Sequence, residues 1–187
     1  MWMEVEQGGE LWFTGRLVTM HFLGAYRHVV DPKNRLAIPS AFRKELAAPD
    51  GKTKLVARPI VSDSDGITRR YVELLTVGEF DTASDCAGME KKLNLSESEM
   101  DLINRTYADA ATLEMDLQGR VLIPECFMAR PENTHDPFGT RLLGTDVFVV
   151  GSRTRIQIWN AQEYIEYRRR TGGRRGTAPV PAGGPGA

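Results

Sequence analysis

The chain has 187 residues, of which 41% are hydrophobic and 26% charged, and its formal net charge is −1. These values are ordinary for a folded protein, and they exclude a chain that is disordered throughout. Its wholly apolar runs are about as long as residues 147–150 (VFVV), far short of the roughly 20 residues that span a bilayer.

The charge is unevenly distributed along the chain. Residues 168–187 hold five arginines and no acidic residue, and the remainder has 19 basic against 25 acidic residues. A uniformly basic surface is therefore excluded, and a polyanion would have to be bound by locally gathered basic groups or by an assembly of several copies.

The start, MWMEVEQGGE, lacks the basic region of a secretory signal, and Cys86 and Cys126 form no CxxC pair. A reduced, cytoplasmic compartment is expected.

The first structural pattern begins after residues 1–21, which show no periodicity and are interpreted as an N-terminal extension. AYRHVVD favours a β-strand, and residues 32–34 (PKN) predict a tight turn, because Pro fixes one φ angle and Asn tolerates the left-handed conformation. RLAIP then predicts a short strand with one apolar face. A helix is expected from residues 39–40, with Phe42 and Leu46 on its apolar stripe.

Two further strands and a helical region follow. KLVARPIV and RRYVELLTV flank the turn-rich SDSDG, which predicts a β-hairpin. Residues 78–110 are expected to be mainly helical. Ser96 and Glu99 have the spacing of a capping box, and Met100, Ile103 and Tyr107 follow at helical spacing.

The pattern of the first turn recurs 85 residues later. This offset places Asp31 on Asp116, Arg35 on Arg120, Leu36 on Val121, Ile38 on Ile123, Pro39 on Pro124 and Phe42 on Phe127. Each unit of roughly 50–55 residues is too small to be stable alone, so the two should share one core. The predicted organisation is an N-terminal extension (1–21), a first repeat (22–80), a helical connector (81–109), a second repeat (110–167) and a disordered tail rich in Arg, Gly and Pro (168–187).

The two segments DPKNRLAIPSAFRKEL and DLQGRVLIP resemble the paired Asp-x-x-x-Arg motifs of the MraZ family, double-repeat members of the SpoVT-AbrB superfamily. The resemblance covers about residues 22–165. It implies an α+β fold, a swapped-hairpin (AbrB-like) β-barrel formed by two internal repeats with flanking helices. It also implies a bacterial transcriptional regulator of the division and cell-wall gene cluster, which assembles into a ring that presents many motifs to DNA.

The same resemblance sets the expected partners and location. The partners would be double-stranded DNA carrying promoter direct repeats and further copies of the chain, with no membrane, cofactor or small-molecule substrate. The protein would be cytoplasmic and nucleoid-associated.

The chain departs from the family pattern at Asn34, where Gly is usual and where the second motif has Gly119. Asn is the next-best left-handed residue, so the turn should survive. ECFMARPENTHDPFG is a poor match to the usual helix after the second motif.

The motif residues suggest specific roles. An Arg just after a tight turn has little conformational freedom to lose and suits binding to phosphate or a guanine edge. The Asp four residues earlier can hold this Arg or bind the N–H groups of the turn. The predicted DNA-binding residues are Lys33, Arg35, Arg120, Arg27 and Arg43, with Lys44 as a further reinforcement of the first unit. The predicted turn-organising residues are Asp31, Asn34, Asp116 and Gly119. Neutral Gln118 makes the second motif electrostatically weaker.

For either motif alone, a surface ion pair worth about 0–1 kcal/mol is the favoured interpretation. The repetition favours a functional role for Arg35 and, less strongly, Arg120, while a structural role is favoured for Asp31 and Asp116. The apolar residues Leu36, Ile38, Val121 and Ile123 are predicted to lie in the core. The leading hypothesis is a DNA-binding regulator. The alternative is a structural, ring-forming interaction protein whose motifs make subunit contacts. The arginine-rich tail either adds nonspecific affinity for DNA or is a solvated end.

An enzyme is the least supported hypothesis, since no acid, base or nucleophile constellation is present and no catalytic residue is predicted. His21, His28 and His135 lack metal-ligand spacing, and Asp63 and Asp65 fit a hairpin turn better than a calcium loop. No metal site is therefore expected.

Overall fold

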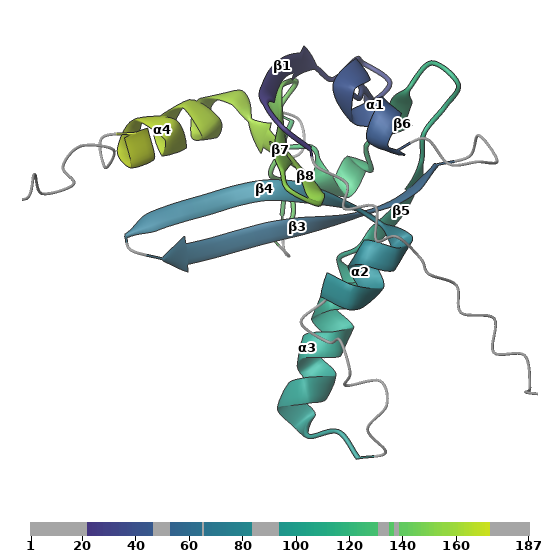
Figure 1. Cartoon of the computed structure of the whole chain (residues 1–187). Helices are drawn as coiled ribbons and strands as arrows, with labels where there is room; N and C mark the ends of the chain where they lie inside the picture. Colours follow the sequence, from purple (N-terminus) through teal and green to yellow (C-terminus); the bar gives the residue numbers. More distant parts are fainter. Residues whose placement is uncertain are drawn as a thin grey trace, which may run out of the picture.

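Six antiparallel strands form the main sheet, which curls into a half-barrel (Figure 1). The structure is a computed structural model that describes residues 22–46, 53–64, 66–83, 94–130, 135–136 and 139–172. The strand order is β1 (Ala25–Val29), β7 (Asp146–Ser152), β8 (Arg155–Asn160), β4 (Ile67–Thr76), β3 (Lys54–Ser64) and β5 (Ala111–Glu114). The predicted N-terminal extension, His21, Cys86 and the chain beyond Gly172 lie outside the described residues.

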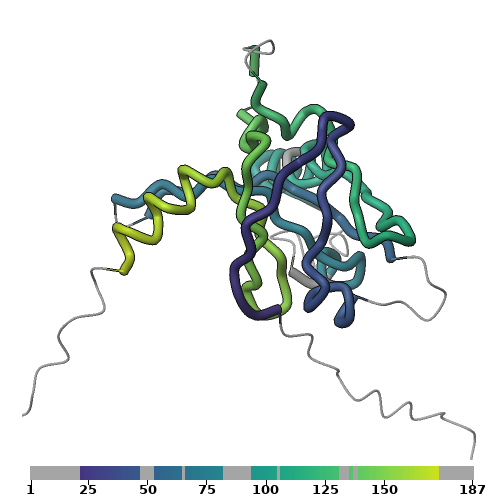
Figure 2. Tube along the Cα trace, turned by 90° about the horizontal axis from the view of Figure 1, so that it is seen from above, coloured from purple at the N-terminus to yellow at the C-terminus, as the bar shows by residue number. Residues whose placement is uncertain are grey.

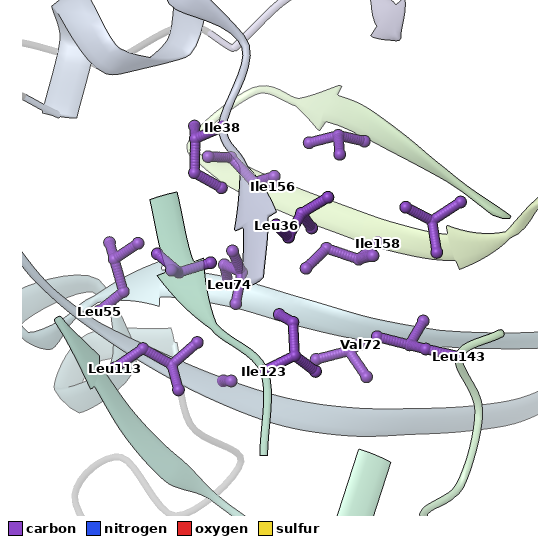
Figure 3. Close-up of a cluster of buried hydrophobic side chains, with 14 of the residues drawn as sticks. Leu36, Ile38, Leu55, Val72, Leu74, Leu113, Ile123, Leu143, Ile156 and Ile158 are labelled. Carbon is purple, nitrogen blue, oxygen red and sulfur yellow. The ribbon is translucent and has the colours of Figure 1, made fainter. Parts of the chain in front are cut away.

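A separate ladder of two strands, β2 (Arg35–Ala37) and β6 (Arg120–Leu122), packs into the curl of the sheet. Leu36 and Val121 are paired across this ladder and are 0% and 1% exposed. Figure 3 shows Leu36 and Ile123 among side chains from β3, β4, β5 and β8. Ile38 and Ile123 are each at most 2% exposed, so the predicted core positions of both motifs are confirmed.

Each of the two hairpins takes its outer strand from a distant part of the chain. β3 and β4 form the predicted hairpin, but its ten residue pairs extend through residues 62–64, which the sequence assigned to the turn. β5 adds to the outer edge of β3. β7 and β8 form the other hairpin, and β1 adds to the outer edge of β7 (Figure 2). The hairpins meet where Val72–Leu74 of β4 pairs with Ile156–Ile158 of β8. The sheet is therefore continuous only through a seam three residues long.

A buried ion cluster lies at this seam. Glu73 is the central seam residue of β4, and its side chain is 2% exposed. Its Oε2 accepts hydrogen bonds from Arg58 of β3, at 3.0 Å from Nε and 2.9 Å from Nη2. Its Oε1 lies 3.2 Å from Nη1 of Arg155 on β8. One carboxylate thus connects three strands.

The helices within the described ranges are α1 (Ser40–Leu46), α2 (Val77–Ala83), α3 (Glu97–Ala108) and α4 (Ala161–Gly172), with a single 3-10 turn, η2 (Glu125–Phe127). The capping box of α3 is confirmed: the Ser96 N–H donates to Glu99 Oε2 at 2.9 Å, and the Glu99 N–H donates to Ser96 Oγ at 3.3 Å. The poor helix signal after the second motif corresponds to η2, which is only three residues long. None of these helices is long and apolar enough to cross a membrane.

The predicted start of the disordered tail at residue 168 is wrong, because α4 continues to Gly172. Arg168 Nη1 donates to the Tyr164 hydroxyl at 3.4 Å, and the Thr171 hydroxyl donates to the Tyr167 carbonyl at 2.9 Å. The last turn is therefore supported by side chains one turn earlier, which a composition argument ignores. α2 likewise crosses the predicted boundary between residues 80 and 81.

Candidate nucleic-acid interface

The carboxylate of Asp31 organises the first turn. Its Oδ1 accepts the backbone N–H groups of Lys33 at 2.8 Å and Arg35 at 2.9 Å. Its Oδ2 accepts Nε–H of Arg35 at 2.7 Å. The Asn34 N–H donates to the Asp31 carbonyl at 2.9 Å, and Asn34 adopts a φ of 59°, in the left-handed region. The Asp therefore holds both the turn and its Arg.

The second turn repeats this network. Asp116 Oδ1 accepts the N–H groups of Gln118 and Arg120, and Oδ2 accepts Nε–H of Arg120, all at 2.9 Å. The Gly119 N–H donates to the Asp116 carbonyl at 2.8 Å, and Gly119 has a φ of 77°. Asn34 and Gly119 thus serve the same conformational need.

These contacts lower the pKa of both carboxyl groups. The largest cause is the backbone N–H of Arg35 for Asp31 and of Arg120 for Asp116, and the guanidinium of the same Arg adds to the effect. Both turns therefore carry an ionised Asp in neutral solution.

We expect both Asp carboxyls to titrate below their ordinary pKa of 3.8. Because the folded-state pKa is depressed, the stabilisation is present above the unfolded-state pKa and is lost as pH falls through the folded-state value. Carboxyl ¹³C NMR titration measures the two midpoints, with Asp31→Asn and Asp116→Asn to assign the signals. Midpoints at or above 3.8 would contradict the turn geometry.

The two turns lie at opposite ends of the β2–β6 ladder. The Ile38 N–H donates to the Gly119 carbonyl at 2.9 Å, and the Ile123 N–H donates to the Asn34 carbonyl at 2.8 Å. Each turn is therefore bound by the strand that follows the other turn. The turns are placed symmetrically about the buried Leu36–Val121 pair.

The outward face of this ladder carries both motif arginines. Leu36 and Val121 point into the core, so alternation places the flanking residues on the opposite face. We call these four residues the ladder face: Arg35, Ala37, Arg120 and Leu122. The side chains of Arg35 and Arg120 are 37% and 31% exposed. A guanidinium has five N–H donors in a fixed fork, so an Arg held at Nε by Asp presents its terminal amino groups in a set orientation.

The other predicted basic residues occupy different places. Lys33 and Lys44 are exposed, Lys33 in the first turn and Lys44 on α1. Arg43, also on α1, reaches the second turn instead of reinforcing the first. Its Nη1 donates to the Gln118 carbonyl at 2.9 Å, and a Cβ on Gly119 would lie 2.1 Å from Arg43 Cδ. Gly119 therefore suits the left-handed φ of the second turn and leaves the space that the Arg43 side chain occupies.

Arg27 lies on β1, outside the ladder. Its Nε donates to Asp146 Oδ1 on β7 at 3.0 Å. This contact raises the pKa of Arg27 and lowers that of Asp146. Arg27 is exposed but is held by a neighbour in the sheet, so the structure does not group it with Arg35 and Arg120.

Sequence reasoning missed two residues that support the first turn. Asn34 Nδ2 donates to Glu125 Oε2 at 2.6 Å, and Asn34 Oδ1 accepts a hydrogen bond from Arg130. Glu125 and Arg130 follow the second motif and lie 91 and 96 residues from Asn34. The sequence indicates these contacts only through Asn34 itself, which stands where the family usually has Gly. An Asn side chain can form hydrogen bonds that Gly cannot.

No group of three potential metal ligands among His, Cys, Asp and Glu occurs within the described ranges. His28 is partly buried, and this burial lowers its pKa. Cys126 is exposed as a residue, but its thiol is partly shielded from water, which raises the pKa of the thiol. The chemistry of the ladder face is therefore that of two oriented guanidinium groups beside small and apolar side chains.

Several proteins of similar sequence carry the name of a transcriptional regulator. The family model described as "MraZ protein, putative antitoxin-like" matches residues 106–172, which run from α3 through the second turn to the end of α4. The "Transcriptional regulator MraZ" of Gluconobacter oxydans is 32% identical over 149 residues, covering 79% of this chain and 80% of that protein. The relative of the same name from Caldicellulosiruptor bescii is 30% identical over 145 residues, covering 77% and 84%. That of Clostridium acetobutylicum is 29% identical over 147 residues, covering 78% and 86%.

The chain belongs to the MraZ family. The resemblance seen in its two Asp-x-x-x-Arg motifs is thereby confirmed over most of the chain.

Proposed function

We propose that this protein is a sequence-specific DNA-binding transcriptional regulator that controls the division and cell-wall gene cluster. The observation that carries the proposal is the placement of Arg35 and Arg120, each held by its own Asp, on one exposed face of a two-stranded ladder. The names of the relatives support the same class. A regulator that acts on the chromosome would be cytoplasmic and nucleoid-associated.

The ladder suits the major groove of double-stranded DNA. That groove admits a two-stranded β-ribbon, and Arg bound to O6 and N7 of guanine is its commonest specific contact. Asp31 and Asp116 hold the two guanidinium groups before DNA arrives, which lowers the entropy lost on binding. The exposed Lys33 supplies a flexible charge for phosphate, and Arg43, which reaches the second turn, is a further basic group at the ladder. Arg27 on β1 is proposed as a contact to DNA away from the ladder.

A homo-oligomeric ring provides the affinity that one small ladder lacks. Once one copy is bound, the others meet neighbouring sites at a high effective concentration, so several weak contacts sum to firm binding. Promoter direct repeats match such an assembly, because each copy then presents its ladder face to an equivalent sequence.

The proposed architecture is a swapped-hairpin barrel formed by repeats 22–80 and 110–167, joined by residues 81–109. Support comes from the exchange of outer strands, with β1 on β7 and β5 on β3, and from the matched hydrogen bonds at an offset of 85 residues. Residues 1–21 and the chain beyond Gly172 lie outside the described residues.

One observation favours a structural ring protein as the second candidate. Leu117 in the second turn is 100% exposed, and Leu122 on the ladder face is 60% exposed. Apolar side chains in this position would suit a contact between subunits, in which case the motifs would serve assembly.

Selection of bound sequences from a random DNA pool distinguishes the two functions. The DNA-binding proposal expects the parent protein to enrich short direct repeats and the Arg35→Ala variant, still assembled, to enrich none. The structural alternative expects no enrichment by either protein, and loss of the oligomer by Arg35→Ala in light scattering. That second pair of results would overturn the proposed function.

A further inference from the structure

Leu122 is a large apolar side chain on the surface that carries both arginines, at the end of β6. It is 60% exposed, whereas the residues before and after it in the chain, Val121 and Ile123, are each 1% exposed. A single exposed Leu is ordinary on a protein surface. This one is held in place, because its strand pairs with β2 and its neighbours are fixed in the core.

The register places Leu122 directly opposite Arg35. Hydrogen-bonded and non-hydrogen-bonded pairs alternate along an antiparallel ladder. Since the Ile38 and Ile123 N–H groups bond Gly119 and Asn34, the Arg35–Leu122 pair is of the non-hydrogen-bonded kind. In such a pair the Cα atoms are about 4.5 Å apart and the side chains are at their closest.

Arg120 lies two residues before Leu122 on the same face, about 7 Å along the strand. Successive bases of one DNA strand are about 3.4 Å apart along the helix axis. A base edge reached by Leu122 is therefore within about two base pairs of the edge reached by either Arg.

The apolar group that a base presents in the major groove is the C5-methyl of thymine. We propose that Leu122 contacts the C5-methyl of a thymine next to the guanine bound by Arg35. This inference rests on the proposed function and adds a specificity-determining residue to it.

The contact would also give the site a direction. Ala37 occupies the position on β2 that corresponds to Leu122 on β6, and it lies opposite Arg120. The Arg35 side of the ladder therefore carries a large apolar neighbour, and the Arg120 side carries only a methyl group. A ladder with the same residues on both sides could bind a site in either orientation. The difference between Leu122 and Ala37 makes one orientation favoured. Direct repeats need such a preference, because every copy must bind its repeat in the same orientation.

The test removes single methyl groups from the DNA. In the duplex selected by the parent protein, each thymine is replaced in turn by deoxyuracil, which keeps the base pairing and loses the C5-methyl. We expect one position next to a required guanine at which deoxyuracil lowers the affinity of the parent about 3- to 5-fold, the effect of one buried methyl group. In Leu122→Ala the same replacement should change the affinity less than 1.5-fold, an upper bound of about 0.2 kcal/mol.

Leu117→Ala is the matched control, since Leu117 is fully exposed but lies in the turn and not on the ladder face. This variant should keep the deoxyuracil effect. The inference is overturned if no deoxyuracil next to a required guanine lowers the affinity of the parent, if Leu122→Ala keeps the effect, or if the selected site has no thymine next to a required guanine. Those results leave DNA binding intact. Failure of the parent to select any sequence would overturn the proposed function and this inference together.

Discussion

Arg35→Ala is expected to lower the affinity for the selected DNA by at least about 100-fold while the oligomer stays assembled. A bidentate contact between Arg and guanine contributes about 1–3 kcal/mol of discrimination, and the loss is multiplied over the copies that bind at once. The fold should tolerate the change, because the side chain is 37% exposed and the Asp31 carboxylate still accepts the backbone N–H groups of the turn. Gel-shift titration and light scattering measure the two properties.

Two variants control this experiment. Arg120→Ala should weaken binding less, because its turn carries Gln118 where the first turn carries Lys33. Lys44→Ala removes an exposed charge of α1 outside the ladder and should change affinity only slightly, and mainly at low salt. An Arg35→Ala protein that binds the selected DNA like the parent would contradict the assignment of Arg35 to the interface.

Glu73→Ala should lower the free energy of unfolding by about 3–5 kcal/mol, the cost of leaving a buried charge without its partner. The Arg58 side chain is 10% exposed and would lose the carboxylate that accepts its Nε and Nη2 hydrogens. The change also lies at the three-residue seam between the hairpins, so little pairing nearby can compensate. Urea unfolding followed by circular dichroism measures the difference.

Arg155→Ala is the matched control for this cluster. Its side chain is 36% exposed, so water can replace part of its contact, and Arg58 still neutralises Glu73. We expect a loss of about 1 kcal/mol or less. The double variant Arg58→Met with Glu73→Leu removes both charges and should recover most of the stability lost in Glu73→Ala. A Glu73→Ala protein that loses less than about 1 kcal/mol would show that the seam does not depend on this ion cluster.

The elements that sequence predicted correctly depend on local signals. The capping box at Ser96 and the turn-rich SDSDG segment act within a few residues, and alternation along RLAIP identified Leu36 and Ile38 as core. Strand partners do not follow from such signals. The addition of β1 to β7 and of β5 to β3 depends on how both hairpins pack around the ladder, which alternation within one strand does not encode.

The candidate site shows the same division. The spacing of Asp31 and Arg35 was enough to anticipate a local network within five residues. Contacts between residues far apart in the chain were not predicted from the sequence. Arg43 extends from α1 to the second turn, and Asn34 forms a hydrogen bond with Glu125, beyond the second motif. The exposure of Leu122, by contrast, follows from alternation, because Val121 and Ile123 on either side of it were predicted to lie in the core.

The exchange of outer strands has a consequence for synthesis on the ribosome. The β3–β4 hairpin is complete once residue 76 has emerged, but β5 and β8, which pair with it, end at residues 114 and 160. At about 5–20 residues per second, the nascent hairpin waits several seconds with both edges unpaired. Unpaired edges invite association between chains. A chain released before residue 120 would contain β2 without its partner, so Leu36 could not be buried against Val121. The core also contains Val147 and Val149 of β7 and Ile156 and Ile158 of β8, so it can close only after β8 has been translated.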